Sequence, residues 1–121
     1  MRTTYVVTGA SRGIGLTIVE DLVRRQSALC LQASSLHGSY QVKYEANYVI
    51  AAVRDRSAQS MQDLRAKYSV DRFQIVHLDL ADPSSIRSAA AHANDCLTGS
   101  LDYLIHCAGV SLEDLTPFEN V

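Results

Sequence analysis

Four short apolar runs alternate with amphipathic segments along the chain. The runs lie at residues 5–7, 48–53, 73–78 and 101–106. Runs without polar alternation are typical of strands that are buried on both faces of a sheet. Between the runs, apolar residues recur every three or four positions, which is the spacing of a helix with one buried face. The pattern therefore predicts four strands separated by three helices.

The three predicted helices cover residues 13–26, a segment around residues 61–68, and a segment that starts at Pro83. Asp82 suits the N-cap of the third helix, Pro83 suits its first position, and Gly99 is expected to stop it. The expected inner residues are Ile14, Ile18, Val19, Leu22 and Val23 in the first helix, Met61, Leu64 and Tyr68 in the second, and Ile86, Ala89, Ala90, Ala93 and Leu97 in the third.

The alternating order of strands and helices predicts an α/β fold. Right-handed crossovers would place helices on both faces of a doubly wound parallel sheet of the Rossmann type. We expect residues 1–121 to form one αβα three-layer domain that is incomplete, truncated after the fourth strand. That strand would keep an unpaired apolar edge, which favours aggregation or pairing with another chain. We therefore expect poor solubility of the chain alone.

Residues 27–47 do not fit this alternation, since they contain four serines, weak periodicity and no clear element. Gly15 and Arg54 are 39 positions apart, whereas the ribose-reading residue of dinucleotide folds follows the glycine motif by about 20 residues. We interpret most of the segment as an insertion on the surface. It is either a tolerated loop, which costs little to close, or translated non-coding sequence, which a comparison of transcript and genome would reveal.

The most informative stretch is residues 8–15, Thr-Gly-Ala-Ser-Arg-Gly-Ile-Gly, where the first strand turns into the first helix. Gly9 would let the chain turn sharply, Gly13 would let the backbone approach a pyrophosphate, and Gly15 would allow close helix–strand packing. Free N–H groups and the positive end of the helix would face the anion. An ordinary glycine-rich turn is the alternative, but the strand–turn–helix context favours dinucleotide binding.

Thr-Gly-x-x-x-Gly-x-Gly resembles the signature of the short-chain dehydrogenases/reductases, and the resemblance covers nearly all of the chain except residues 27–47. It extends to Val49-Ile-Ala-Ala-Val-Arg-Asp55, Leu78-Asp79-Leu80 and His106-Cys107-Ala108-Gly109. The sequence of residues 48–55 is most similar to that of fungal carbonyl reductases and ketoreductases, including norsolorinic-acid-reductase-like proteins. The resemblance implies an NADP-dependent oxidoreductase that reduces a ketone or aldehyde by hydride transfer.

The resemblance also implies a set of cofactor-binding residues. They are Gly9, Ser11, Arg12, Gly13, Ile14, Gly15, Arg54, Asp79, Leu80, Cys107, Ala108 and Gly109. Asp79 would meet the adenine, unless it only bonds the backbone of its own loop. His106 and Cys107 stand where the family usually has two asparagines, which puts the hydrogen-bonding role of the second in doubt. We expect Cys107 to be a buried small apolar side chain and His77 to be packed rather than catalytic.

The end of the second predicted strand discriminates between NADP and NAD. An NAD enzyme places an acidic residue there to bind the ribose 2′-hydroxyl, but here Val53 is followed by Arg54. A planar guanidinium suits the 2′-phosphate of NADP, and the resemblance implies that Arg12 approaches from the other side. We therefore expect NADP(H), with NAD less favoured. Arg54 could instead pair only with Asp55, or Asp55 could reach the ribose and favour NAD.

The family's catalytic Tyr-x-x-x-Lys is absent from the chain. At that spacing, the two lysines Lys43 and Lys67 follow Ser39 and Asp63. In the family, the Tyr exchanges a proton with the substrate oxygen, and the Lys lowers the pKa of that Tyr. We assign no catalytic residue and expect the chain alone to be inactive, binding at best weakly through the adenosine half. A non-catalytic dinucleotide-binding module and an inactive truncated product are the alternatives.

Composition narrows the function classes further. A net charge of −2 and a pI near 6.0 suggest neither nucleic acid nor an anionic membrane as a partner. The three cysteines and four histidines lack the spacing of a disulfide framework or a metal site. No apolar stretch approaches the ~20 residues of a membrane helix. The first residues break their apolar run after three positions, so we expect no signal peptide. We expect a cytoplasmic protein with a small-molecule carbonyl substrate, and homo-oligomerisation stays open.

Overall fold

The computed structural model describes residues 2–33, 40–97 and 99–108, and its centre is a parallel sheet of four strands. The strands are β1 (Thr4–Thr8), β4 (Tyr48–Val53), β5 (Phe73–His77) and β6 (Tyr103–His106), in the order β5-β4-β1-β6. Every neighbouring pair is parallel. The predicted parallel sheet is confirmed, and β4 has the predicted bounds.

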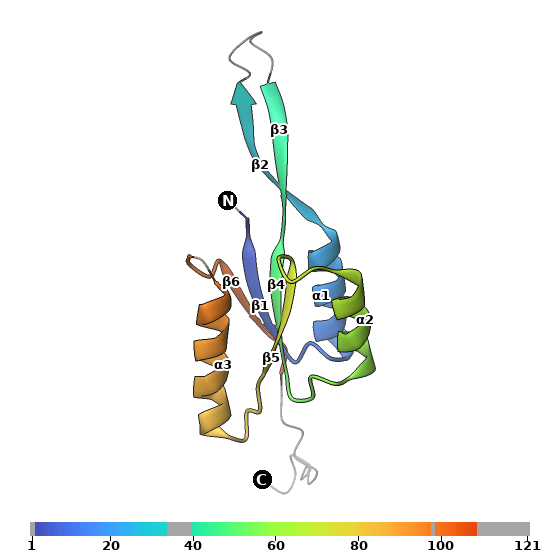
Figure 1. The fold of residues 1–121 in the computed structure, drawn as a ribbon, viewed down its shortest axis with the longest axis vertical. Coiled ribbons are helices and arrows are strands. Elements are labelled where there is room, and N and C mark those ends of the chain that lie inside the picture. Colours follow the sequence, from blue (N-terminus) through green and yellow to red (C-terminus); the bar gives the residue numbers. More distant parts are fainter. Residues whose placement is uncertain (1, 34–39, 98, 109–121) are drawn as a thin grey trace, which may run out of the picture.

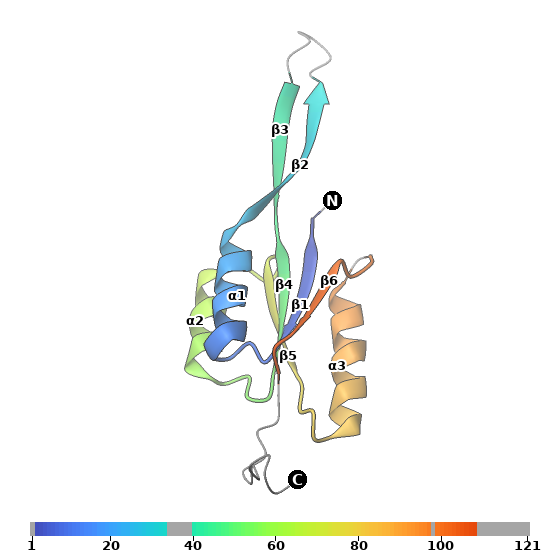
Figure 2. The same cartoon turned by 180° about the vertical axis from the view of Figure 1, so that it is seen from behind.

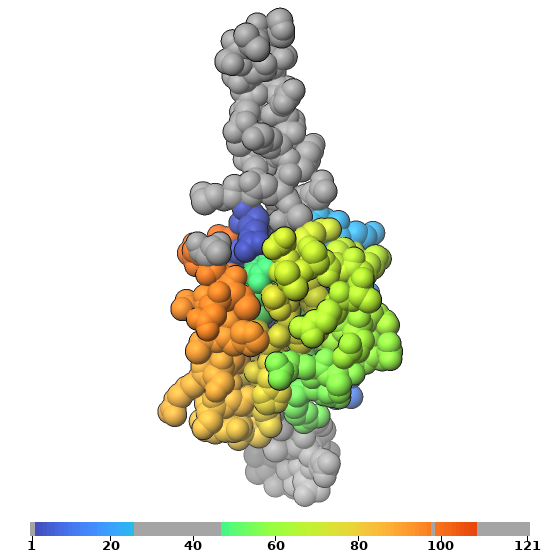
Figure 3. Space-filling model, viewed as in Figure 1, coloured from blue at the N-terminus to red at the C-terminus, as the bar shows by residue number. Residues whose placement is uncertain are grey.

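Helices cover both faces of this sheet. They are α1 (Gly13–Arg24), α2 (Gln59–Lys67) and α3 (Pro83–Cys96). Helices α1 and α2 lie on one face and α3 on the other, so the molecule has three layers (Figure 1). In the space-filling view, the orange atoms of α3 and the green atoms of α2 stand on either side of the yellow atoms of β5 (Figure 3). The doubly wound αβα arrangement is therefore confirmed.

Each face of the sheet has its own apolar core, because alternate residues of a strand point to opposite faces. The core toward α1 and α2 includes Val7, Val49, Ala51, Val19, Val23, Met61 and Leu64. The core toward α3 includes Val6, Ile50, Ala52, Val76 and Ala89. All six residues of β4 are buried, since strands flank β4 on both edges and helices cover it on both faces.

Helix α3 starts as predicted but turns a different face toward the sheet. The carboxylate of Asp82 accepts a hydrogen bond from Ser84 N at 2.9 Å, and Pro83 is the first helical residue. The buried residues are Ser85 and Ala89, whereas Ile86 is 42% exposed and Ala90 is exposed as well. The predicted inner positions Ile86 and Ala90 were therefore wrong. The hydroxyl of Ser85 accepts a hydrogen bond from the Asp79 N–H at 2.8 Å, which fixes this orientation of the helix.

Helix α1 is two residues shorter than predicted. It ends at Arg24, and Gln26 already belongs to the next strand. Val19 and Val23 are buried, but Ile14, in the first turn of the helix, is 77% exposed. The inclusion of Ile14 in the inner stripe was wrong.

The segment between α1 and β4 contains two strands where no regular element was expected. Strands β2 (Gln26–Ala33) and β3 (Tyr40–Ala46) form a separate antiparallel pair. The sequence of β3, YQVKYEA, alternates apolar and polar residues with the period of a strand, and this short signal was missed. The pair projects from the end of the sheet where β1 begins, opposite to the turn between β1 and α1 (Figures 1 and 2). That residues 27–47 are an insertion stays a prediction.

Strand β6 is the edge of the described sheet. It pairs with β1 only, and Tyr103 and Leu104 are 56% and 63% exposed. The Tyr103 ring stacks on the Tyr5 ring at a centroid distance of 5.1 Å. Within residues 2–33, 40–97 and 99–108, β6 is thus an apolar strand that pairs on one side. That its other edge stays unpaired, and that the chain is poorly soluble, remain predictions.

Candidate nucleotide-binding site

The turn from β1 into α1 has a backbone that only glycine adopts easily. Gly9 has φ +67° and Gly13 has φ +61°. A Cβ atom at Gly9 would lie 2.7 Å from the backbone N and Cα of Ala108, so this turn is also pressed against the chain that leaves β6. Side chains are therefore excluded from Gly9 by both conformation and space.

The other two glycines of the motif have different surroundings. A Cβ atom at Gly15 would lie 2.2 Å from the carbonyl oxygen of Gly9, so the first turn of α1 packs directly on the glycine turn. A Cβ atom at Gly13 would meet no heavy atom of the described residues within 4 Å. Gly13 therefore borders open space at the start of the helix, where a ligand could reach the backbone.

Helix α1 begins without a side-chain cap. Its N-cap residue is Arg12, whose extended backbone leads into the helix and whose side chain makes no capping hydrogen bond. The first N–H groups of a helix have no partner within the helix, and together with the helix dipole they favour an anion. The start of α1 thus offers N–H donors that its N-cap side chain leaves uncapped, beside the space at Gly13 that no described residue fills.

Two neighbouring elements hold the glycine turn in place. The N–H of Gly9 donates to the carbonyl of Ala52 at the end of β4, at 3.0 Å. The hydroxyl of Ser60, in the first turn of α2, donates to the carbonyl of Ser11 at 2.6 Å. The turn is therefore fixed against β4 and α2, and Ser60 is a contributor that the sequence did not reveal.

Thr8 joins the glycine turn to β6. Its Oγ1 accepts hydrogen bonds from the N–H groups of Cys107 at 3.1 Å and Ala108 at 3.2 Å. The same oxygen lies 2.7 Å from Nδ1 of His106. The position of Thr8 immediately before the first glycine was the available signal for this role, which our sequence reasoning did not use.

Arg54 and Asp55 follow β4 directly, and both are exposed. The carboxylate of Asp55 accepts hydrogen bonds from the backbone N–H of Ser57 at 2.9 Å and from its hydroxyl at 2.6 Å, and these bonds lower the pKa of Asp55. Among the described residues, Asp55 makes no ion pair with Arg54, so the alternative of a paired Arg54 is not what the structure has. The guanidinium groups of Arg54 and Arg12 both face solvent.

Asp79, in the loop after β5, makes the hydrogen bond to its own loop that was the alternative to adenine binding. One carboxylate oxygen of Asp79 accepts a hydrogen bond from the N–H of Ala81 at 3.0 Å, as in an Asx turn. Leu80 is half-buried beside it.

His77, at the end of β5, is exposed with its Nδ1 3.4 Å from Ser85 Oγ, so the expectation that it is packed was wrong. His77 is the last residue of β5, which is the outer strand of the described sheet.

The described members of the predicted cofactor set gather at one edge of the sheet. They follow the carboxyl ends of β1, β4, β5 and β6, which a parallel sheet brings to the same side. Cys107 is half-buried rather than buried, and its thiol is free. Gly109 lies outside the described residues. Ligands of open α/β sheets bind at this carboxyl edge, where the strand order changes direction; here that point lies between β1 and β6.

Comparison with known proteins assigns this fold and this turn to one family. The family model described as the KR domain matches residues 3–120. The chain belongs to the KR-domain family. The resemblance to short-chain dehydrogenases/reductases that the glycine motif carries is thereby confirmed.

Relatives of this KR domain include two carbonyl reductases of Mus musculus. Carbonyl reductase (NADPH) 1 is 32% identical over 123 residues, which cover 97% of this chain and 36% of the relative. Carbonyl reductase (NADPH) 3 is 33% identical over 121 residues, which cover 94% and 35%. The crystal structure of NADPH-bound carbonyl reductase from chicken fatty liver is 33% identical with a TM-score of 0.67, and the match covers 100% of this chain and 42% of that one.

The KR domain therefore spans little more than a third of the length of its curated relatives. The narrower similarity to fungal ketoreductases stays a prediction. Within residues 2–33, 40–97 and 99–108, no helix has the length and apolar character needed to cross a membrane.

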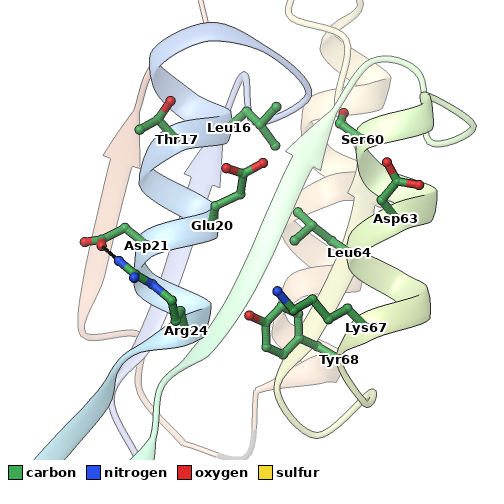
Figure 4. Close-up of a pocket in the computed structure, with 10 residues that line it drawn as sticks. All are labelled: Leu16, Thr17, Glu20, Asp21, Arg24, Ser60, Asp63, Leu64, Lys67 and Tyr68. Atoms are coloured by element: carbon green, nitrogen blue, oxygen red, sulfur yellow. Dashed lines mark hydrogen bonds and ion pairs between the residues drawn. The ribbon is translucent and has the colours of Figure 1, made fainter.

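A hollow of about 730 Å³ lies between α1 and α2 (Figure 4). Its walls are Leu16, Thr17, Glu20, Asp21, Arg24, Ser60, Asp63, Leu64, Lys67 and Tyr68. The charges are of both signs, and Arg24 donates to Asp21 at 2.7 Å, which lowers the pKa of Asp21. Because none of the predicted cofactor residues lines it, we do not assign this hollow to the dinucleotide.

Proposed function

We propose that this KR domain binds NADP(H) along the carboxyl edge of its sheet, as the cofactor-binding part of a short-chain oxidoreductase that reduces a carbonyl group. The observation that carries the proposal is the start of α1, where uncapped N–H groups border open space at Gly13. A pyrophosphate needs such donors and such close approach to the backbone. The residues present therefore fit the cofactor.

Charge at the end of β4 supports NADP over NAD. The 2′-phosphate of NADP carries about two negative charges, which an Arg fork binds through charge-assisted hydrogen bonds. Arg54 is exposed there and is not engaged by Asp55, whose carboxylate binds Ser57 instead. Arg12, at the start of α1, supplies a second cation near the glycine turn.

The remaining members of the predicted set have supporting places in this proposal. Asp79 and Leu80 would receive the adenine at the end of β5, through the carboxylate oxygen that does not bind Ala81. Cys107, Ala108 and Gly109 would border the cofactor after β6. Both sets of residues follow the carboxyl ends of strands, at the same edge of the sheet as the glycine turn.

NADPH would supply the hydride, and the chain's own residues would hold and orient it. A carbonyl reduction also needs a proton donor for the substrate oxygen, and the sequence contains no Tyr-x-x-x-Lys to provide it. We therefore expect no reductase activity from the 121-residue chain alone. The same absence favours a second candidate, a domain that binds the dinucleotide without catalysis. A small-molecule carbonyl substrate, a cytoplasmic location and a homo-oligomer belong to the proposal for the whole enzyme.

A charge reversal at Arg54 tests the proposal. We expect Arg54→Asp to lower the affinity for NADP⁺ by ~10-fold or more, the value of one charge-assisted hydrogen bond, with little change for NAD⁺. Arg56→Asp is the matched control, because Arg56 is an exposed cation of the same loop. Affinities would be measured by calorimetry or NMR titration. An unchanged ratio of NADP⁺ to NAD⁺ affinity in Arg54→Asp, or an equal effect of Arg56→Asp, would refute the assignment of Arg54.

A further inference from the structure

His106 lies at the carboxyl edge of the sheet with one ring nitrogen held by the protein. It ends β6 and pairs with Thr8 in the parallel register. Its Nδ1 is 2.7 Å from Thr8 Oγ1. Thr8 is buried, whereas His106 is exposed. Among the described residues, Nε2 of His106 has no hydrogen-bond partner.

The hydrogen bonds of Thr8 assign the tautomer of His106. A hydroxyl has two lone pairs and one proton. The N–H groups of Cys107 and Ala108 both donate to Thr8 Oγ1, at 3.1 and 3.2 Å, and so occupy its lone pairs. The hydroxyl proton is then directed to Nδ1 of His106, which must accept it. In a neutral imidazole, the ring proton is therefore on Nε2, and Nε2–H is a donor that no described residue uses.

The topology shows which half of a dinucleotide would pass this donor. Strands β4 and β6 lie on opposite sides of β1. With its 2′-phosphate near Arg54 after β4 and its pyrophosphate at the glycine turn after β1, NADP would continue toward β6. The nicotinamide-side half of the cofactor begins with the second phosphate of the pyrophosphate and its ribose, and the end of β6 carries His106.

We propose that His106 donates its Nε2–H to an oxygen of the nicotinamide-side ribose phosphate of NADP(H), while Thr8 holds the ring in the required tautomer. The proposal rests on the proposed dinucleotide site and adds a residue to it. His106 would be a direct ligand contact, and Thr8 would be a positioning residue that acts through His106. The imidazole would thus take a role in this chain at a place where the family usually has an asparagine.

Two substitutions separate the roles of the two ring nitrogens. The side-chain amide of Asn reaches about as far as Nδ1, so His106→Asn keeps an acceptor for Thr8 and loses the distal donor. The amide of Gln reaches about as far as Nε2, so His106→Gln keeps the distal donor. We expect His106→Asn to lower the affinity for NADP⁺ about three- to ten-fold, as for one hydrogen bond, and His106→Gln to retain most of it.

The direct readout is the imidazole NMR spectrum of the 121-residue chain. The free chain should show a protonated Nε2 and an unprotonated Nδ1 at His106, with the signals assigned by their loss in His106→Gln. Three probes then locate the contact: NADP⁺, 2′-phospho-ADP-ribose and adenosine 2′,5′-bisphosphate. The first two contain the nicotinamide-side ribose phosphate, and the third lacks it. The amides of Gly9 and Gly13 report on the glycine turn in the same samples.

The proposal expects the glycine amides to respond to NADP⁺ and 2′-phospho-ADP-ribose, which both contain the pyrophosphate. It expects the Nε2–H of His106 to shift with these two probes and not with adenosine 2′,5′-bisphosphate. An equal His106 shift with adenosine 2′,5′-bisphosphate would overturn it, as would a proton on Nδ1. Glycine shifts without any His106 shift would overturn it while leaving the dinucleotide site standing. No shift at the glycines with any probe would overturn the proposed function and this inference together.

Discussion

Strands β4 and β6 are the two neighbours of β1, and they share direction and apolar composition but differ in burial. Both run parallel to β1, and both are apolar in sequence, YVIAAV in β4 and YLIH in β6. All of β4 is buried, whereas Ile105 is the most covered residue of β6 and is only partly buried. Burial of a strand is thus decided by what surrounds it, and apolar composition alone does not tell a central strand from an edge strand.

The proposed site depends on both strands. The glycine turn is bonded to β4 through Gly9 and Ala52, and it is bonded to the end of β6 through Thr8 and residues 106–108. One side of the site is therefore anchored on the fully buried strand β4, and the other on the exposed strand β6. We expect the β4 side to govern stability and the β6 side to be more sensitive to local change.

The largest expected effect is a difference in unfolding free energy between two matched side-chain truncations, one in each strand. Ile50 and Leu104 lie on the α3 face of their strands, at 0% and 63% exposure. Ile50→Ala should lower the free energy of unfolding by about 2–5 kcal/mol, because it leaves a cavity, and Leu104→Ala by less than about 1 kcal/mol. Urea unfolding followed by circular dichroism measures both. Equal losses would show that β6 is covered in solution.

The next effect compares two glycines of the same turn. Gly9→Ala and Gly13→Ala both place a side chain at positive φ, at a cost of about 1–2 kcal/mol each. Gly9→Ala should cost more, because its Cβ would meet the backbone of Ala108. Gly13→Ala should instead weaken NADP⁺ binding more than its loss of stability explains, because its Cβ would occupy the open space. Unfolding and binding measurements on both variants check this, and a reversed order would contradict the assigned roles.

A smaller effect concerns pH at the start of β4. Burial raises the pKa of Tyr48 to about 12, above the value near 10 of an unfolded chain. A raised pKa means that the stabilisation is complete below pH ~10 and is lost as pH rises toward 12. Unfolding free energies measured at intervals above pH 9 should decline, and the decline should be shallower in Tyr48→Phe. Burial also raises the pKa of Tyr5, so a residual decline is expected. Identical slopes would contradict the burial of the Tyr48 hydroxyl.

The smallest effect on stability, but a visible effect on association, is expected at the β6 edge. Leu104→Lys places a charge on an exposed edge strand, which opposes edge-to-edge pairing. We expect less self-association in sedimentation velocity and nearly unchanged unfolding. Arg87→Lys, an exposed site on α3 that keeps its charge, serves as the control. Self-association that is the same in Leu104→Lys and wild type would place the contact elsewhere.

Sequence patterns predicted the elements that are dictated locally. The buried runs gave the strands, Asp82 and Pro83 gave the start of α3, and residues 8–15 gave the strand–turn–helix motif. These features depend on residues close in sequence, whose conformational preferences add up within one element. The parallel direction of the four strands was predictable as well, because a helix between two strands supplies the crossover connection that parallel strands need.

The errors concern relations across the fold. The face of α3 could not be told from its sequence, because Ser85 and Ile86 differ by one helical position and the choice depends on the hydrogen bond to Asp79. His77 was misjudged because it ends the outer strand of the sheet, and the strand order depends on contacts across the fold. At the site, the link between Thr8 and His106 joins residues 98 positions apart, and only the β1–β6 register brings them together.

The central claim is that the turn at residues 9–15 seats the pyrophosphate of NADP(H). Its most direct test is a titration of the ¹⁵N-labelled chain with NADP⁺ and NAD⁺, following the backbone amides. We predict saturable shifts at Gly9, Gly13 and Gly15 with both dinucleotides, and tighter binding of NADP⁺. A well-dispersed spectrum of a folded chain in which these amides respond to neither dinucleotide would contradict the account.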